Sequence, residues 1–241
     1  MDDPGLSLAH RLQPATAVHA LVPAAGRGLR FGGILSKQFE LIAGRPLLAW
    51  TLDRLVAAGV DSVTVALAGE IASDPPGWLR VHPTVRAIAG GPTRQASVAL
   101  ALSACPAKPG DLVLVHDGAR PALDGVDLLA VCQAALNADG AVLGRRVSDT
   151  VKRLDGDKIA ETIERSSLFR AETPQVFWRQ VLERAFAAAT RARFEGTDES
   201  ALVERLPGTV VVAVEARAPN PKLTTAADLP QLRALLETRP N

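Results

Sequence analysis

The chain has 241 residues and a formal net charge of +1, with 47% hydrophobic and 22% charged residues. A globular protein of this length buries a substantial core, so the composition excludes wholesale disorder. The near-neutral balance excludes a general nucleic-acid or membrane-binding surface, and any anion must therefore be bound locally.

Few features of the sequence bear on the cellular compartment. Cys105 and Cys132 are the two cysteines, and with no Cys-x-x-Cys pair they predict neither a disulfide framework nor a zinc site. The first residues, MDDP, lack the basic and apolar segments of a signal peptide. No apolar run approaches the ~20 residues that cross a bilayer. We therefore expect a cytoplasmic protein.

Prolines and glycine interrupt residues 1–16, which predicts a loosely ordered leader before a single domain at residues 17–241. Within that domain, apolar runs of strand length recur at residues 18–22, 62–68, 85–88, 112–115, 141–143 and 209–214. Apolar residues at helical spacing fall between and after them, at residues 46–58, 97–103, 127–138, 180–193 and 228–237.

Strands that alternate with helices imply crossover connections and a mainly parallel sheet. We therefore expect a doubly wound α/β fold. Residues 145–172 break the alternation, because two polar-rich strand segments, 147–154 and 158–163, flank an Asp-Gly-Asp turn. This pattern predicts a β-hairpin, which we expect to project from the domain as an arm.

The loop after the first expected strand is rich in glycine and carries three cations. Residues 21–33 read LVPAAGRGLRFGG and residues 36–38 read SKQ, which brings Arg27, Arg30 and Lys37 into one segment. Glycine lets backbone N–H groups approach a ligand closely, and cations neutralise an anionic one. Since open α/β sheets bind ligands beyond the carboxyl ends of their strands, this loop predicts a polyphosphate cradle.

Two better-known phosphate loops do not match this segment. A Walker A loop needs Gly-Lys-Ser/Thr, but Lys37 stands between Ser36 and Gln38. The dinucleotide fingerprint needs a small residue where this chain has Phe31, which disfavours an NAD-dependent dehydrogenase. A tight connection without a ligand is the alternative for a glycine-rich turn, and the three cations favour anion binding over it.

A carboxylate follows the apolar run at residues 112–115, in the sequence His116-Asp117-Gly118. Mg²⁺ usually takes one or two carboxylates together with substrate phosphates, so Asp117 suits a metal ion or a ribose hydroxyl. The alternative role for Asp117 is that of a helix or turn cap. We expect His116 to be a structural neighbour of Asp117.

A second glycine loop, GGPTRQAS, lies at residues 90–97 between an expected strand and a helix. Its paired glycines permit the close approach of a flat ligand, while Arg94 and Ser97 offer donors near a helix N-terminus. Taken alone, Ser97 is an ordinary cap. Together with the first loop and Asp117, it becomes a candidate nucleotide contact.

The ordered set of motifs resembles the 2-C-methyl-D-erythritol 4-phosphate cytidylyltransferases over residues 18–238. The segments that carry the resemblance are PAAGRGLR followed by SKQ, GGPTRQAS, VLVHDGARP, SDT, ETPQ, GTDESALVE and NPKLT. The resemblance implies a nucleotidyltransferase of Rossmann-like type that joins CTP to methylerythritol phosphate with Mg²⁺ and releases pyrophosphate. It places the chain in the non-mevalonate isoprenoid pathway.

The resemblance also assigns roles to residues. Arg30 and Lys37 would stabilise charge on the α-phosphate, and Asp117 would lie near the ribose and hold the metal. Nucleotide contacts would come from Pro23, Ala24, Ala25, Gly26, Gly28, Gly91, Arg94 and Ser97. The reaction centre and the second substrate would be contacted by Thr150, Arg165, Thr173, Thr197 and Lys222. Alone, the last five would read as surface charges or as cap and strand residues.

The family resemblance further implies that the arm at residues 145–172 embraces a second subunit. Thr150 and Arg165 would then act in trans, and the enzyme would be a homodimer. Departures from the usual family pattern are Phe31, Ser36, Pro92 and Gly118. None of them removes a cation or carboxylate that the chemistry uses, although Pro92 lacks a backbone donor.

Two alternatives keep the nucleotide loops. One is a cytidylyltransferase for ribitol 5-phosphate or a related polyol phosphate, which differs at the second-substrate residues. The other is a regulatory protein that binds CTP without turnover, and the joint presence of Arg30, Lys37 and Asp117 counts against it.

Overall fold

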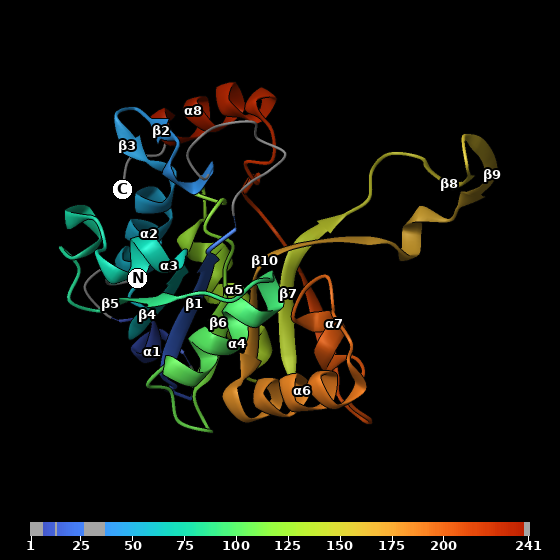
Figure 1. Ribbon diagram of the computed structural model, residues 1–241. Coiled ribbons are helices and arrows are strands. Elements are labelled where there is room, and N and C mark those ends of the chain that lie inside the picture. Colours follow the sequence, from blue (N-terminus) through green and yellow to red (C-terminus); the bar gives the residue numbers. More distant parts are fainter. Residues whose placement is uncertain (1–6, 13, 27–36, 239–241) are drawn as a thin grey trace.

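The computed structural model describes residues 7–12, 14–26 and 37–238. A seven-stranded sheet in the order β11-β7-β10-β6-β1-β4-β5 runs through the domain (Figure 1). Its strands are β1 (Val18–Ala24), β4 (Ser62–Leu67), β5 (Val85–Ala89), β6 (Leu112–Val115), β7 (Gly140–Arg146), β10 (Phe169–Trp178) and β11 (Val211–Glu215). Every neighbouring pair is parallel except the two pairs that β10 makes. The prediction of a mainly parallel sheet is confirmed.

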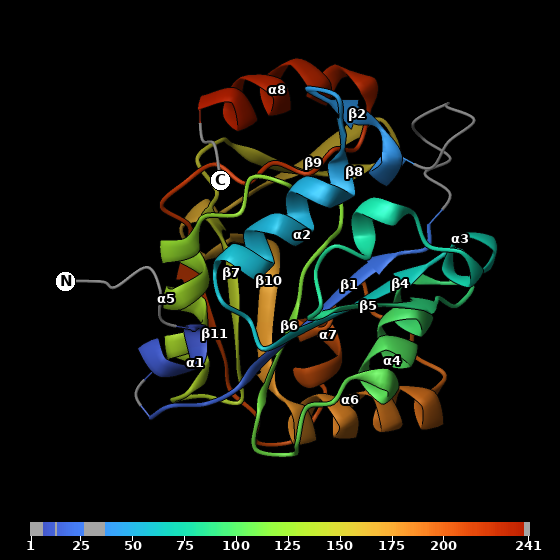
Figure 2. The same cartoon turned by 90° about the vertical axis from the view of Figure 1, so that its left-hand side faces the viewer.

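Helices cover both faces of the sheet, as the doubly wound prediction requires (Figure 2). One face packs against α2 (Leu47–Ala57) and α5 (Gly125–Ala135), and the other packs against α4 (Arg94–Ala104) and α6 (Arg179–Ala192). Strand β6 shows why: Leu112 and Leu114 belong to the first core, whereas Val113 and Val115 belong to the second. Successive side chains of a strand point to opposite faces, so an uninterrupted apolar strand serves both cores.

Shorter elements complete the chain. The helices are α1 (Leu8–Arg11), α3 (Gly69–Ser73), α7 (Ser200–Val203) and α8 (Leu229–Thr238), and the short strands are β2 (Leu41–Ile42) and β3 (Arg45–Pro46). The 3₁₀ turns are η2 (Lys37–Phe39), η3 (Gly77–Leu79), η4 (Arg165–Ser167) and η5 (Ala226–Asp228). Among the described residues, no helix is both long and apolar enough to span a bilayer.

The expectation of a loosely ordered leader at residues 1–16 is wrong for residues 8–12. Leu8 and Leu12 are fully buried in the core, and the Leu8 N–H donates to the Gly59 carbonyl at 2.9 Å. Two leucines four residues apart bury the same side of a short helix. The contacts that order this segment therefore come from the domain and not from local propensity.

Strand β10 is the main element that sequence patterns do not indicate. It contains Pro174 and charged residues, features that argue against a central strand. The pairing of β10 with β7 shifts register between Ala171 and Gln175, so Pro174 occupies an irregularity where no regular ladder bond is needed.

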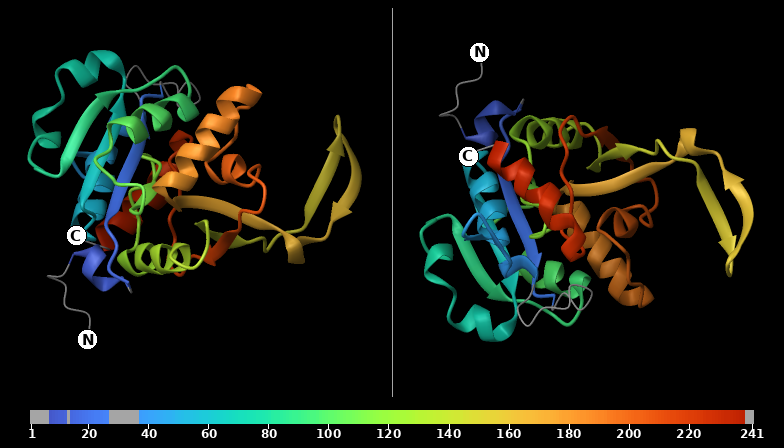
Figure 3. Two further views of the ribbon diagram at one scale, coloured as in Figure 1. Left: turned by 90° about the horizontal axis from the view of Figure 1, so that it is seen from below. Right: turned by 90° about the horizontal axis from the view of Figure 1, so that it is seen from above.

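Strands β8 (Val151–Asp155) and β9 (Lys158–Ile163) pair antiparallel as a separate two-stranded sheet. This hairpin extends away from the body of the domain (Figures 1 and 3). Residues 152–162 are all exposed. Leu154 and Ile159 are cross-strand partners, and each is at least 60% exposed.

Candidate functional site

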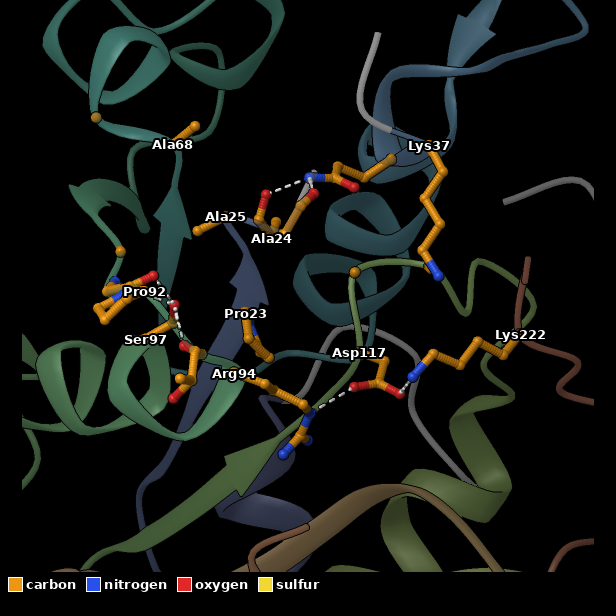
Figure 4. Close-up of a pocket in the computed structure, with 18 of the residues that line it drawn as sticks. Pro23, Ala24, Ala25, Lys37, Ala68, Pro92, Arg94, Ser97, Asp117 and Lys222 are labelled. Atoms are coloured by element: carbon orange, nitrogen blue, oxygen red, sulfur yellow. Dashed lines mark hydrogen bonds and ion pairs between the residues drawn. The ribbon is translucent and has the colours of Figure 1, made fainter. Parts of the chain in front are cut away.

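A pocket of about 890 Å³ opens at the carboxyl ends of four adjacent parallel strands (Figure 4). Strands β1, β4, β5 and β6 each lead directly into a segment that lines it. Among the described residues of the pocket wall, those expected from the sequence are Pro23, Ala24, Ala25, Gly26, Lys37, Gly91, Arg94, Ser97, Asp117 and Lys222. Residues from three separate motifs and the C-terminal region thus meet in one place.

Gln38 holds the end of β1 against the next part of the chain. Its side-chain Nε2 donates to the carbonyls of Ala24 and Gly26, the latter at 3.1 Å, and Gln38 is buried. The neighbouring Lys37 Nζ donates to the Leu223 carbonyl at 2.9 Å. Gln38 lies within the SKQ motif, but the sequence assigns it no role. Its partners are backbone carbonyls, which every residue carries, so only the structure reveals this contact.

The second glycine loop packs so closely on the first that side chains would not fit. A Cβ on Gly90 would lie 2.5 Å from Ala25 Cβ and 2.9 Å from Ser97 Oγ. A Cβ on Gly91 would lie 2.6 Å from Ala96 Cβ. The Gly91 N–H donates to Ser97 Oγ at 3.1 Å, and the Ser97 hydroxyl donates to the Thr93 carbonyl at 2.9 Å. Ser97 therefore supports the loop from the first turn of α4.

Four charges of alternating sign run from the interior to the pocket. Glu199, at the buried end, accepts two hydrogen bonds from Arg94, Nη1 to Oε1 at 2.8 Å and Nη2 to Oε2 at 2.9 Å. Arg94 Nε donates to Asp117 Oδ1 at 3.2 Å, and Lys222 Nζ donates to Asp117 Oδ2 at 2.7 Å. Figure 4 shows Arg94 and Lys222 reaching Asp117 from opposite sides. Glu199 lies in the GTDESALVE motif, but the sequence does not indicate its pairing with Arg94, since 105 residues separate the two.

These contacts determine the charge states of Asp117, Arg94 and Glu199. Burial opposes the charged form of Asp117, but Arg94 and Lys222 outweigh it and hold the pKa of this carboxyl well below its usual range. Burial likewise opposes the charge on Arg94, yet Glu199 and Asp117 raise the pKa of the guanidinium. Burial raises the pKa of Glu199, and the two-point contact with Arg94 favours its ionised form.

His116 and Thr173 fix the backbone that carries Asp117. Burial lowers the pKa of His116 to about 4, so the imidazole is neutral at pH 7. Its Nε2 lies 3.0 Å from the Arg120 carbonyl, which can only accept, so Nε2 carries the proton and Nδ1 is the acceptor. The Thr173 hydroxyl then donates to Nδ1 at 3.2 Å and accepts from the Asp117 N–H at 3.0 Å. The expectation that His116 is a structural neighbour agrees with this geometry.

Asp117 is also the sole carboxylate among the described residues that line the pocket. No group of three or more His, Cys, Asp or Glu side chains that could hold a metal occurs in the described part of the chain. Mg²⁺ binds to proteins through one or two carboxylates with substrate phosphates supplying other ligands. Each Asp117 oxygen accepts a hydrogen bond from a neighbouring cation and has a further lone pair, so the residue fits a metal ion shared with a phosphate ligand.

Among the described residues, four of the expected site residues do not line the pocket: Thr150, Arg165, Thr173 and Thr197. Gly28 and Arg30 lie outside the described residues, together with the departures Phe31 and Ser36. Thr150 and Arg165 are exposed on the arm, where the Arg165 guanidinium donates to the Ser148 carbonyl. Thr197 is exposed next to Asp198.

Thr173 is buried beneath Asp117, as described above, and touches the site through that residue. The departures Pro92 and Gly118 both line the pocket. A Cβ on Gly118 would lie 3.0 Å from Leu48 Cδ1, so an alanine here would be tightly packed.

The chain matches one family model over most of its length. The model for 2-C-methyl-D-erythritol 4-phosphate cytidylyltransferase matches residues 18–238. A curated protein of that name from Xanthomonas campestris pv. campestris (strain 8004) is 44% identical over 229 residues, which cover 92% of this chain and 86% of the relative. Another from Stenotrophomonas maltophilia (strain K279a) is 40% identical over 230 residues, which cover 93% and 99% of the two chains.

Solved structures agree with the sequence relatives. The crystal structure of 2-C-methyl-D-erythritol 4-phosphate cytidylyltransferase from Thermus thermophilus has a TM-score of 0.78 at 35% identity, covering 92% of this chain and 99% of that one. The structure from Francisella tularensis has a TM-score of 0.80 at 27% identity, covering 92% and 100%.

Proposed function

Because the chain belongs to the family of 2-C-methyl-D-erythritol 4-phosphate cytidylyltransferases, we propose that it transfers the cytidylyl group of CTP to 2-C-methyl-D-erythritol 4-phosphate. The products are pyrophosphate and 4-diphosphocytidyl-2-C-methyl-D-erythritol, an intermediate of the non-mevalonate isoprenoid pathway. The observation that carries this proposal is the meeting of Lys37, Lys222 and Asp117 with both glycine loops in one pocket.

The reaction needs charge neutralisation more than a protein nucleophile. A phosphate oxygen of the methylerythritol phosphate attacks the α-phosphorus of CTP in line and forms a new P–O bond. The bond between the α-phosphorus and the oxygen that bridges it to the β-phosphate breaks, and its electron pair leaves with pyrophosphate. The attacking group is already an anion, so no strong general base is required. Lys37 and Arg30 stabilise the negative charge that builds up at the α-phosphate, as cationic groups do in nucleotidyl transfer.

The nucleotide occupies the part of the pocket between the two glycine loops. We assign Gly91 and Ser97 to cytosine recognition, with Arg94 in a supporting role. The backbone from Pro23 to Gly26, continuing through Gly28, follows the nucleotide. The close approach of Gly90 to Ala25 supports this assignment, because a flat base needs the narrow space that small residues leave.

We propose a divalent cation, Mg²⁺, as cofactor. Asp117 would hold it together with phosphate oxygens, and when bound it would neutralise phosphate charge and favour the departure of pyrophosphate. The ion pair with Lys222 and the hydrogen bond from Arg94 keep Asp117 ionised and oriented for this role. Lys222 is 36% exposed at the pocket and can also reach a substrate phosphate.

The second substrate would require residues from a second copy of the chain. We propose that Thr150 and Arg165 act in trans, on the pocket of a partner in a homodimer. The exposed cross-strand pair Leu154 and Ile159 supports this, since large apolar side chains on a projecting hairpin indicate a protein contact. Thr197, which is exposed, and Thr173, through Asp117, would complete the substrate side. CTP is a cytoplasmic nucleotide, and we place the dimer in the cytoplasm.

The proposal is tested by measuring pyrophosphate release with Mg²⁺ and CTP, in parallel with methylerythritol phosphate and with ribitol 5-phosphate. Release that depends on methylerythritol phosphate is expected. Release only with ribitol 5-phosphate would keep the mechanism and replace the substrate. CTP binding without release in either reaction would indicate a regulatory protein and contradict the proposed function.

A further inference from the structure

Glu199 lies at the buried end of the line of charges that reaches the pocket. Its side chain is 1% exposed, and both of its carboxylate oxygens are taken by Arg94. Glu199 is not among the described residues that line the pocket. Its side chain is therefore connected to the pocket through Arg94, which in turn bonds to Asp117.

On the basis of the proposed cytidylyl transfer, we propose that Glu199 is a positioning residue for that reaction. It holds the Arg94 guanidinium at two points and balances its charge, so that Asp117 and Lys222 keep the geometry that the transfer requires. The motif that contains Glu199, GTDESALVE, assigns a role to Thr197 and none to Glu199.

The geometry of the arginine explains why two-point contact matters. A guanidinium is a planar fork with five N–H donors in fixed directions. Glu199 occupies Nη1 and Nη2, which leaves Nε to donate a single bond to Asp117. Without Glu199, the whole fork can turn toward Asp117 and compete with Lys222 for the same carboxylate.

The balance of charges also indicates that Glu199 helps to place Asp117 and Lys222. Glu199, Arg94, Asp117 and Lys222 together carry no net charge, with opposite signs at each contact. A third cation, Arg120, lies 3.7 Å from Asp117 and is balanced in turn by Glu172 at 3.7 Å. Neutralising Glu199 would leave Arg94 without its balancing carboxylate and would add one net positive charge to the cluster. Ground-state binding of an anionic nucleotide would then persist, while the placement of Asp117 and Lys222 would change.

The segment around Glu199 is anchored by other side chains, which separates positioning from folding. Gln95 on α4 accepts from the Gly196 N–H at 2.8 Å and donates to the Phe194 carbonyl at 3.1 Å. Gln175 on β10 accepts from the Ser200 N–H at 3.0 Å. The backbone on both sides of Glu199 is thus held without Arg94.

The first test is Glu199→Gln, which keeps the size of the side chain and removes its charge. We expect kcat to fall at least about tenfold, because small misplacements of reacting groups cost large factors in rate. The dissociation constant of CTP, measured by calorimetry, should change by no more than about threefold. The control Gln95→Ala loosens the same segment and should keep kcat near that of the wild type.

A wild-type kcat in Glu199→Gln would overturn the proposal, and so would an equal loss of kcat in Gln95→Ala. A parallel loss of CTP affinity would assign Glu199 to nucleotide binding and would overturn it as well. Pyrophosphate release by the wild-type protein is measured in the same series. Its absence would contradict the proposed function, whereas the ratio of variant to wild type tests the positioning role.

A second variant keeps the test decisive if Glu199→Gln does not fold. Arg94→Gln alone leaves Glu199 as a buried carboxylate without its cation, whereas Arg94→Gln with Glu199→Gln replaces the ion pair by two amides. The double variant should melt at a higher temperature than Arg94→Gln and turn over at the same rate. A double variant at least about tenfold slower than Arg94→Gln would show that Glu199 acts by another route and would overturn the proposal.

Discussion

The floor of the pocket, formed by Arg94, Asp117 and Lys222, and the projecting arm hold their charged groups in different ways. At the floor, Asp117 is bound from two sides by Arg94 and Lys222, and Glu199 supports Arg94 from the core. On the arm, Arg153 pairs with Glu161 across the hairpin, and Arg165 bonds to the Ser148 carbonyl, both at exposed positions. The floor is supported from the chain's own core, whereas these two arginines are held by partners on the arm.

This difference bears on where each group can act. Groups on the floor are oriented before any ligand arrives, which is what electrostatic stabilisation of a transition state requires. Groups on the arm acquire a fixed place only by contact with another body. We therefore expect substitutions on the floor to reduce turnover and substitutions on the arm to affect the second substrate and the association of subunits.

The largest effect is expected at the pocket wall. Lys37→Ala should lower turnover by about a hundredfold to a thousandfold, because it removes a cation from the developing charge. CTP affinity should fall much less. Pyrophosphate release and calorimetry with CTP measure the two quantities, and Lys108→Ala, an exposed lysine away from the pocket, is the matched control. Full activity in Lys37→Ala would remove this residue from the mechanism.

Asp117→Asn should have the next largest effect on turnover. The amide keeps the shape but removes the negative charge between Arg94 and Lys222, so we expect turnover to fall by about a hundredfold and the Mg²⁺ concentration for half-maximal rate to rise. Magnesium titrations of the initial rate provide the measurement, with Asp74→Asn at an exposed site as control. An unchanged magnesium dependence would argue that Asp117 does not hold the cation.

On the arm, Arg165→Ala should raise the KM for the polyol phosphate by about tenfold and leave the KM for CTP within about twofold. The reason is that a cation which grips only the second substrate contributes uniform binding to it. Steady-state kinetics with each substrate varied in turn separate the two constants. Arg153→Ala, which removes an arm cation paired with Glu161, should change neither. If Arg165→Ala weakened CTP alone, the proposed second-substrate role would be wrong.

The smallest effect on the pocket is expected from the apolar pair of the arm. Leu154→Ser with Ile159→Ser should weaken self-association while CTP affinity stays as in the wild type, because neither side chain is packed within its own chain. Sedimentation over a range of concentrations measures the association. Val81→Ser, at another exposed apolar residue, is the control. Unchanged association in the double variant would exclude this pair from the interface.

The parts of the molecule that sequence predicts are those whose signal is local. The apolar strands β1, β4 and β6 and the loops that follow them were readable because period, glycine and charge occur within a few residues. Strand β10 was not readable, since Pro174 and its charged neighbours are tolerated only at a register irregularity. The helix at Leu8 depends on burial against a distant part of the chain.

The residues of the site also divide into those whose role the sequence indicates and those whose role only the structure reveals. Lys37 and Asp117 stand in motifs, and the structure places both in the pocket. Glu199 and Gln38 also stand in motifs, but their partners are a distant arginine and backbone carbonyls, and the sequence does not reveal such contacts. Thr150 and Arg165 are named by resemblance alone, because one copy of the chain does not bring the arm to its own pocket lining.

A purified heterodimer tests most directly whether the pocket of one copy is completed by the arm of another. One subunit carries Lys37→Ala and the other carries Arg165→Ala, with distinct tags, and turnover is measured at a low concentration of polyol phosphate. If the arm acts in trans, one of the two sites contains both intact residues, and about half of the wild-type turnover should return. Turnover no higher than the mean of the two parent homodimers would contradict completion of the pocket by a partner's arm.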